Sequence, residues 1–107
     1  MADWSQQARD DLLHIFLHVA RDNPAAARRL LARLRRTKGL ADEHPLVGRI
    51  VAEFDAVNIR ECIVPPYRVI YQVRPEGALF LTVLHGRQDL YHLGPASYVV
   101  AEDRDPS

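Results

Sequence analysis

The chain has 107 residues, the size of one compact domain, and 48% of them are apolar, so a core can form without metal or disulfide cross-links. The single cysteine, Cys62, excludes an internal disulfide framework. Fourteen basic and 14 acidic side chains give a formal net charge of zero, whereas proteins that grip nucleic acid through its phosphates are usually basic.

The N-terminal residues show no basic segment followed by a long apolar run, and no stretch reaches the length of a membrane span. We therefore expect a cytoplasmic protein with no membrane partner. His14 and His18 lie four residues apart, but no third ligand is in sequence reach, so no metal site is predicted. No cofactor is expected either.

Two helices are predicted first. Ser5 can cap a helix that runs to about Asp22. Its apolar stripe has helical spacing and comprises Ala8, Leu12, Ile15, Phe16 and Val19. Leu13, Leu17 and Ala20 widen this stripe, so we expect the helix to be covered on more than one side.

The second helix begins at Asn23-Pro24, which is an N-cap followed by proline at the first helical position. Gly39 is predicted to end it as a C-cap. The buried stripe comprises Ala27, Leu30, Leu31 and Leu34. Because the joint at 21–23 is short, the two helices should form an antiparallel hairpin.

The following segment, 40–56, is mixed in character, and His44-Pro45 and Gly48 interrupt any long element. The apolar period then changes to two, which is typical of strands. Pro65-Pro66 and the turn at 75–77 separate the strands. Three are predicted, at 57–64, 67–74 and 79–85.

Strand 67–74 alternates cleanly: Tyr67, Val69, Tyr71 and Val73 face one way, and Arg68, Ile70, Gln72 and Arg74 face the other. Strands with short connections form an antiparallel meander. The predicted fold is therefore α+β, with the N-terminal helical hairpin packed on one face of a small, mainly antiparallel sheet.

Several segments now support a resemblance. Val64-Pro65-Pro66-Tyr67-Arg68-Val69-Ile70-Tyr71-Gln72-Val73, followed by Val83-Leu84-His85-Gly86-Arg87-Gln88-Asp89-Leu90, resembles the RelE/ParE superfamily of type II toxins. Segments 5–12, 23–27 and 44–49 resemble its first helix, second helix and following loop, in the same order. We expect one toxin domain over residues 1–107, with a core at about 4–90 and a C-terminal extension, 91–107, to which the resemblance does not reach.

The resemblance implies a bacterial toxin that forms a hetero-oligomer with a cognate antitoxin. ParE-like members poison DNA gyrase, whereas RelE-like members cut messenger RNA on the ribosome. Two motifs, Pro-Pro-Tyr-Arg and Leu-His-Gly-Arg, resemble ParE-like members more closely than RelE-like ones, and the zero net charge favours the same side. Two alternatives stay open: a ribosome-dependent endoribonuclease, and a degenerate toxin retained only as antitoxin partner.

Carried over by motif, the nuclease interpretation makes Arg68 and Arg87 phosphate-binding sheet residues, because a planar guanidinium can donate two parallel hydrogen bonds. Arg60 on the preceding strand could join them. His85 and Tyr91 are candidate acids or bases, since cleavage by a 2′-hydroxyl requires both.

Structural interpretations compete with these. In them, Arg68 pairs with Glu61 on the adjacent strand, and His85 only donates structural hydrogen bonds. Tyr67 and Tyr71 alternate with valine, which favours the core over a base-stacking platform. Cys62, within a strand, is expected to be a small buried apolar residue.

Six cations and no acid lie between Arg28 and Lys38. Such a run is usually a solvated helix face. It would also suit an acidic antitoxin segment or nucleic acid. The residues proposed for partner binding on this helix are Arg28, Arg29, Arg33 and Arg36.

Overall fold

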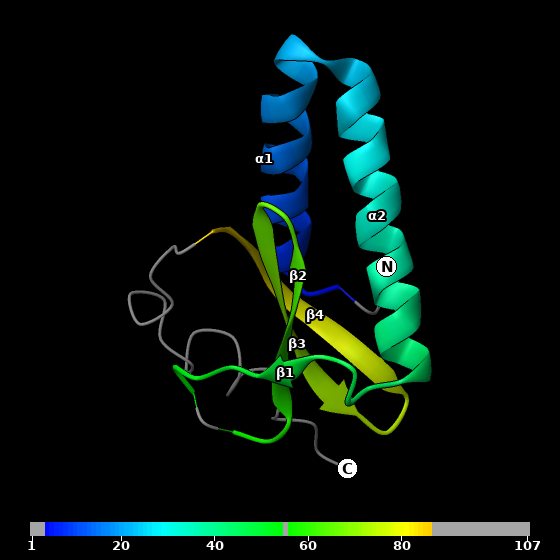
Figure 1. The fold of residues 1–107 in the computed structure, drawn as a ribbon, viewed down its shortest axis with the longest axis vertical. Helices are drawn as coiled ribbons and strands as arrows, with labels where there is room; N and C mark the ends of the chain where they lie inside the picture. The colour runs from blue at the N-terminus through cyan, green and yellow to red at the C-terminus, as the bar shows by residue number, and fades with distance from the viewer. Residues whose placement is uncertain (1–3, 55, 87–107) are drawn as a thin grey trace.

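The computed structural model of the protein describes residues 4–54 and 56–86. Two helices precede a four-stranded antiparallel sheet, which confirms the predicted α+β arrangement (Figure 1). The elements are α1 (Gln6–Asp22), α2 (Pro24–Glu43), β1 (Arg49–Ile50), β2 (Ile59–Val64), β3 (Tyr67–Arg74) and β4 (Gly77–His85). Within the described ranges, neither helix has the length and apolar character needed to cross a bilayer.

Both predicted helix starts are confirmed. The Ser5 hydroxyl accepts a hydrogen bond from the Ala8 N–H and donates one to the Leu81 carbonyl, so it caps α1 and ties that helix to β4. The Asn23 side chain accepts from the Ala26 N–H, while its own N–H donates to the Val19 carbonyl. One residue therefore ends α1 and begins α2, which fixes the tight hairpin.

The predicted end of the second helix at Gly39 is wrong, because α2 continues for another turn to Glu43. The extra turn places Ala41 in the core, with none of its surface exposed. Lys38 Nζ lies 2.7 Å from an Asp42 carboxylate oxygen, and that carboxylate also accepts from the Ala78 N–H. Packing and this contact to the β3–β4 turn outweigh the low helix propensity of one glycine.

The sheet has one more strand than the sequence predicted. Its order is β1-β2-β3-β4, and the two-residue β1 pairs with β2 through Arg49↔Glu61 and Ile50↔Arg60. A strand of two exposed residues shows no detectable period in sequence. β2 itself begins at Ile59 rather than at the predicted residue 57.

The outer edge of β4 is covered by the start of the chain. Trp4 forms a parallel bridge with Phe80, and the Ser5 N–H donates to the Phe80 carbonyl. One carboxylate oxygen of Asp11, on α1, accepts from the Thr82 hydroxyl and from the Val83 N–H. These contacts satisfy backbone groups that an edge strand otherwise leaves open.

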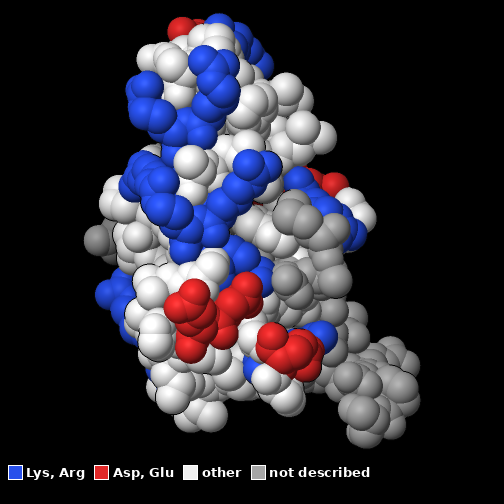
Figure 2. All heavy atoms as spheres, turned by 90° about the vertical axis from the view of Figure 1, so that its right-hand side faces the viewer, with Lys and Arg blue, Asp and Glu red and all other residues white. Residues whose placement is uncertain are grey.

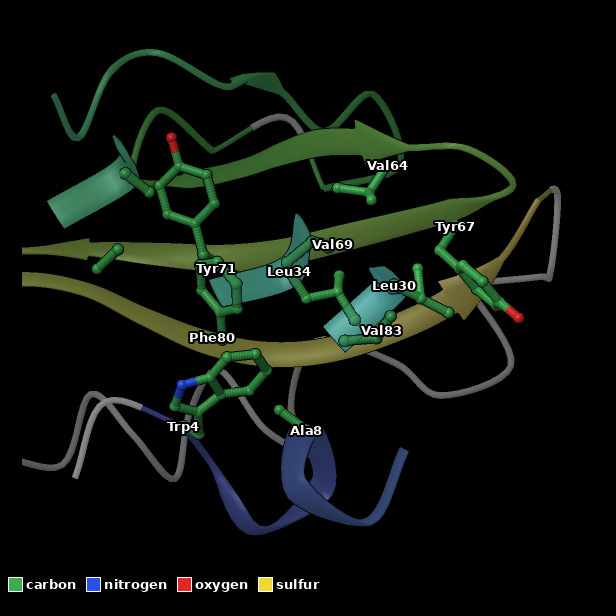
Figure 3. Packing of buried hydrophobic residues seen from close by; sticks show 12 residues of the cluster. Trp4, Ala8, Leu30, Leu34, Val64, Tyr67, Val69, Tyr71, Phe80 and Val83 are labelled. Carbon is green, nitrogen blue, oxygen red and sulfur yellow. The ribbon is translucent and has the colours of Figure 1, made fainter. Parts of the chain in front are cut away.

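The hairpin packs on the sheet face that carries the odd-numbered residues of β3, as the alternation predicted (Figure 3). Tyr67 and Tyr71 are core residues, in agreement with the structural interpretation. The buried cluster on this face includes Trp4, Ala8, Leu30, Leu34, Val64, Tyr67, Val69, Tyr71, Phe80 and Val83. A smaller cluster on the opposite face comprises Val51, Ile59, Ile70, Leu79, Leu81 and Leu84.

The hairpin extends past the sheet at the end where its two helices join (Figure 1). Leu13 and Leu17 are 59% and 58% exposed, so the expectation that α1 is covered on more than one side is wrong for the isolated chain. The sheet covers only the stripe that contains Ala8, and the far side of α1 stays open.

Tyr71 connects the core to the loop that precedes β1. Its ring packs beside Phe80, and its hydroxyl donates to the Pro45 carbonyl and accepts from the Gly48 N–H. Burial raises the pKa of the Tyr71 hydroxyl, so it stays protonated and able to donate. A Cβ on Gly48 would lie 2.8 Å from the Tyr71 hydroxyl, so only glycine allows this close approach.

Substituting Tyr71→Phe removes both hydrogen bonds and leaves the buried Gly48 N–H without its partner. We expect unfolding to become easier by about 1–3 kcal/mol, measured by urea denaturation. Tyr67→Phe is the matched control, because no hydrogen bond of the Tyr67 hydroxyl occurs within the described residues. Equal losses in the two variants would contradict the anchoring role of the Tyr71 hydroxyl.

Candidate functional site

The sheet face opposite the hairpin carries a cluster of four charged side chains. Glu61 on β2 and Arg68 on β3 both point to this face, since Ile63 pairs with Arg68 and alternation places Glu61 on the same side as Ile63. Arg49 comes from β1, opposite Glu61. Glu53 comes from the segment after β1, so the cluster joins three strands and a loop.

Arg68 is held by two carboxylates at once. Its Nη1 and Nη2 each lie 3.1 Å from one oxygen of Glu53, and its Nε lies 2.8 Å from Glu61 Oε1. Nη2 also lies 2.7 Å from the same Glu61 oxygen. The guanidinium therefore makes a bidentate contact with Glu53, the arrangement that gives Arg–carboxylate pairs their directionality.

Glu61 lies between two arginines. Its side chain is 6% exposed, and its second oxygen accepts from Arg49 Nε at 2.7 Å. Arg49 itself is 70% exposed, so only the inner part of the cluster is shielded from water. Two arginines and two glutamates give this cluster a formal charge of zero.

A shallow hollow of about 790 Å³ lies over the cluster. Its lining combines the four charged residues with apolar groups from β1, β2 and the Pro65-Pro66 connection, whose peptide bond is cis. The hydrogen bonds from Arg68 lower the pKa of Glu53, against the opposing effect of burial. Burial alone would lower the pKa of Arg68, but its bonds to Glu53 and Glu61 outweigh this and raise it.

A family model described as "ParE toxin of type II toxin-antitoxin system, parDE" matches residues 2–90. The chain belongs to the ParE toxin family. It is thus a type II toxin–antitoxin toxin, within the RelE/ParE superfamily, and the family implies an antitoxin partner. Among curated proteins, no relative matches the chain at a significant level.

Not all the residues predicted for a nuclease site come together. Arg60 pairs with Tyr71 across β2 and β3, so its side chain lies on the hairpin face, opposite Arg68. Its guanidinium donates to the carbonyls of Val57 and Gly48. The prediction that Arg60 joins Arg68 is therefore wrong, because the pleat separates them.

His85 lies at the end of β4 opposite Tyr67, and the two rings meet edge to face with centroids 5.4 Å apart. This register places the imidazole on the Tyr67 side of the sheet, not on the Arg68 side. Arg87 and Tyr91 lie outside the described residues, as does the extension 91–107. Cys62 is half-buried beside the hairpin-side core, and burial raises the pKa of its thiol.

The predicted pair between Arg68 and Glu61 is confirmed. No pattern in the sequence indicated that Glu53 or Arg49 belongs to the cluster. Glu53 is 15 residues from Arg68 and belongs to the segment without a periodic pattern. The pairing of β1 with β2 brings Arg49 to Glu61, and the segment that follows β1 brings Glu53 to Arg68. The nearest signal in the sequence is the acidic pair Glu53 and Asp55, which has no defined geometry on its own.

The cations of α2 behave differently. Arg28, Arg29, Arg33, Arg35 and Arg36 make no ion pair with any of residues 4–54 and 56–86. Figure 2 shows Lys and Arg gathered over this helix, with Asp and Glu below them. Lys38 is the exception: it is buried and paired with Asp42.

Replacing Arg68 with Gln would leave Glu53 and Glu61 close together with one fewer cation between them. We expect a loss of about 2–3 kcal/mol in the free energy of unfolding, measured by urea denaturation. Arg29→Gln, which removes an exposed cation that makes no ion pair with residues 4–54 and 56–86, should change it by under about 0.5 kcal/mol. If Arg68→Gln left the free energy of unfolding unchanged, the cluster would not hold the sheet together.

The lowered pKa of Glu53 makes part of the stability depend on pH. The pKa of Glu53 in the folded state lies below the usual 4.5. Its carboxylate therefore makes its full contribution to the free energy of unfolding above pH 4.5, and this contribution is lost as pH falls through the folded-state pKa. Unfolding followed from about pH 7 to about pH 3 should show this loss, and Glu53→Gln should flatten the acid limb of the curve. The same acid limb in both proteins would contradict the assignment.

Proposed function

We propose that this toxin stops growth by binding DNA gyrase and trapping it on cleaved DNA, with no chemistry of its own. The observation that supports this is the state of Arg68. The best-placed arginine for a phosphate on the sheet already donates to two carboxylates. The structure therefore offers a surface for binding at this face rather than a cation ready for a reacting phosphate.

Cleavage of RNA by its 2′-hydroxyl needs a base, an acid and positive charge on the developing phosphorane. A phosphate entering the hollow would have to displace Glu53 from Arg68 and would then lie beside Glu61. Arg49 is the other cation there, and its Nε already contacts Glu61. A cluster with zero formal charge gives the phosphate little net attraction.

The acid–base candidate is also in the wrong place for such a reaction. His85 lies on the Tyr67 side of the sheet, whereas Arg68 lies on the opposite face. A proton donor and a phosphate ligand on opposite faces cannot act on one bond. Among the described residues, this separation favours inhibition by binding over RNA cleavage.

The test uses purified toxin with gyrase and plasmid DNA. We expect loss of supercoiling and accumulation of cleaved DNA. Both effects should be prevented when the antitoxin is added before the toxin. His85→Ala should poison gyrase as well as the original chain does, because the proposal gives the imidazole no role.

Transcript ends mapped after toxin induction provide the opposing measurement. Cuts within translated codons, reduced in Arg87→Ala or His85→Ala, would identify a ribosome-dependent endoribonuclease and overturn the proposal. No effect on gyrase at large excess and no transcript cuts would point to a degenerate toxin retained as antitoxin partner.

A further inference from the structure

The side of α2 that faces away from the core carries two rows of arginines. The buried stripe of this helix is centred on Leu34. At 100° per residue, one row lies about 100–120° to one side of Leu34, and the other lies about 140–160° to the opposite side. The first row is Arg28 and Arg35, and the second row is Arg29 and Arg36. All four side chains are exposed, and Figure 2 shows Lys and Arg gathered over this helix.

Contacts within the described fold do not account for these arginines. None of the four makes an ion pair with residues 4–54 or 56–86. On α1, in contrast, exposed polar groups pair along the helix, as Gln6 does with Asp10. On α2, Arg33 lies about one turn from both Arg29 and Arg36, and like-charged pairs at this spacing destabilise a helix. Such a surface is better suited to binding a polyanion than to stabilising the fold.

The outward side of α2 also lacks the apolar anchors that protein partners use. Across this helix, which lies entirely within the described residues, Leu40 near the C-terminal end is the only exposed large apolar side chain. Contacts between proteins depend on apolar or aromatic anchors near the centre of the interface. The phosphate backbone of nucleic acid, in contrast, is held largely by exposed arginine and lysine. The outward side of α2 therefore fits nucleic acid better than another protein.

The arrangement of the two rows fits a duplex. The rows are about 100° apart around the helix axis. The major groove of DNA is about 12 Å wide, admits one α-helix and is bordered by the phosphates of two strands. Between the rows lie Ala25, Ala32 and Gly39, and a Cβ at Gly39 would have open space around it. Short side chains there allow α2 to approach the groove with one row beside each strand.

A hollow beside the second row extends the basic surface toward β2. It has a volume of about 260 Å³, and its polar lining comes from Arg33, Arg36 and Thr37. Among the described residues, no carboxylate lines it. Phosphates of the strand beside the second row would therefore meet additional positive charge and no acidic side chain.

We propose that the outward side of α2 binds duplex DNA, with the row of Arg28 and Arg35 on one strand and the row of Arg29 and Arg36 on the other. The inference rests on the proposed function for its setting, in which the duplex is the DNA that gyrase has cleaved. The toxin would then contact the enzyme and its DNA together.

Duplex DNA alone provides the first probe. A fluorescently labelled duplex of about 20 base pairs should bind the purified full-length chain at low salt, measured by fluorescence anisotropy. Four phosphate contacts predict an affinity that falls about 100-fold between about 50 and 200 mM salt. A single strand of the same sequence should bind more weakly, because it offers a phosphate backbone to one row only. Absence of binding, or equal affinity for the single strand, would overturn the proposal.

Removing one row at a time tests the geometry. Arg28→Gln with Arg35→Gln, and separately Arg29→Gln with Arg36→Gln, should each weaken duplex binding about tenfold or more at low salt. Each pair should also lower the slope of log affinity against log salt by about 2. Melting temperatures should stay close to the original, because all four side chains are exposed. A loss of affinity from only one row would overturn the placement of α2 between two strands.

A matched control separates this surface from the net charge of the chain. His14→Glu with His18→Glu lowers the net charge by the same two units at exposed positions of α1. Because salt screens charges that lie away from the DNA, this variant should lose under about threefold in affinity. A loss as large as that of the row variants would show that total charge alone decides binding, which contradicts the proposal.

The gyrase assay tests the contact in its setting. Each row variant should need about tenfold more toxin than the original chain to accumulate cleaved DNA. Full potency in variants that no longer bind the duplex would overturn the inference. If the original chain has no effect on gyrase, the proposed function fails, whereas the duplex measurements still decide whether α2 binds DNA. Row variants that lose antitoxin binding but keep their affinity for DNA would assign this surface to the antitoxin and overturn the proposal.

Discussion

The position of the charged cluster depends on one buried side chain, Tyr71. Its ring is fixed in the hairpin-side core, and its hydroxyl holds the loop at Pro45 and Gly48 through two hydrogen bonds. That loop leads directly into β1, a strand too short to hold its place by pairing alone. Together with the bond from Arg60 to the Gly48 carbonyl and that from the Val51 N–H to the Ile59 carbonyl, this anchor brings Arg49 against β2 and Glu53 over β3. The core thus determines the geometry of the opposite sheet face.

The cluster then determines what that face can do. Arg68 is one of the two arginines that the nuclease interpretation assigns to a phosphate, yet the carboxylates beside it neutralise its charge. A partly buried arginine between two carboxylates is costly to separate from either one. The same contacts that orient the guanidinium therefore occupy its donors. This is the physical reason for proposing an inhibitor rather than a nuclease. It follows from the position of Arg68 between two carboxylates, because an arginine as such is compatible with either function.

The sequence predicted what depends on local pattern. Helix caps at Ser5 and Asn23, the alternation of β3 and the packing of the hairpin on one face all follow from spacing and side-chain chemistry. It failed where a distant contact decided the outcome. Gly39 ends no helix because Ala41 is needed in the core, and β1 is positioned by the distant contacts of Tyr71 and by pairing with β2. Glu53 reached the site for the same reason, through a loop whose course no periodic pattern records.

The zero net charge has a different meaning once the charges are placed. In the sequence, the zero net charge argued against a polyanionic partner. That total, however, combines two regions whose charges are arranged differently. Around the sheet, Glu53, Glu61 and Asp42 pair with cations of this chain. On the outward faces of α2, five arginines have no carboxylate within the described residues. Charge that is already paired contributes little to binding, whereas unpaired charge can give a partner both affinity and orientation. Charged side chains that remain available to attract a partner are therefore found on the hairpin rather than around the sheet.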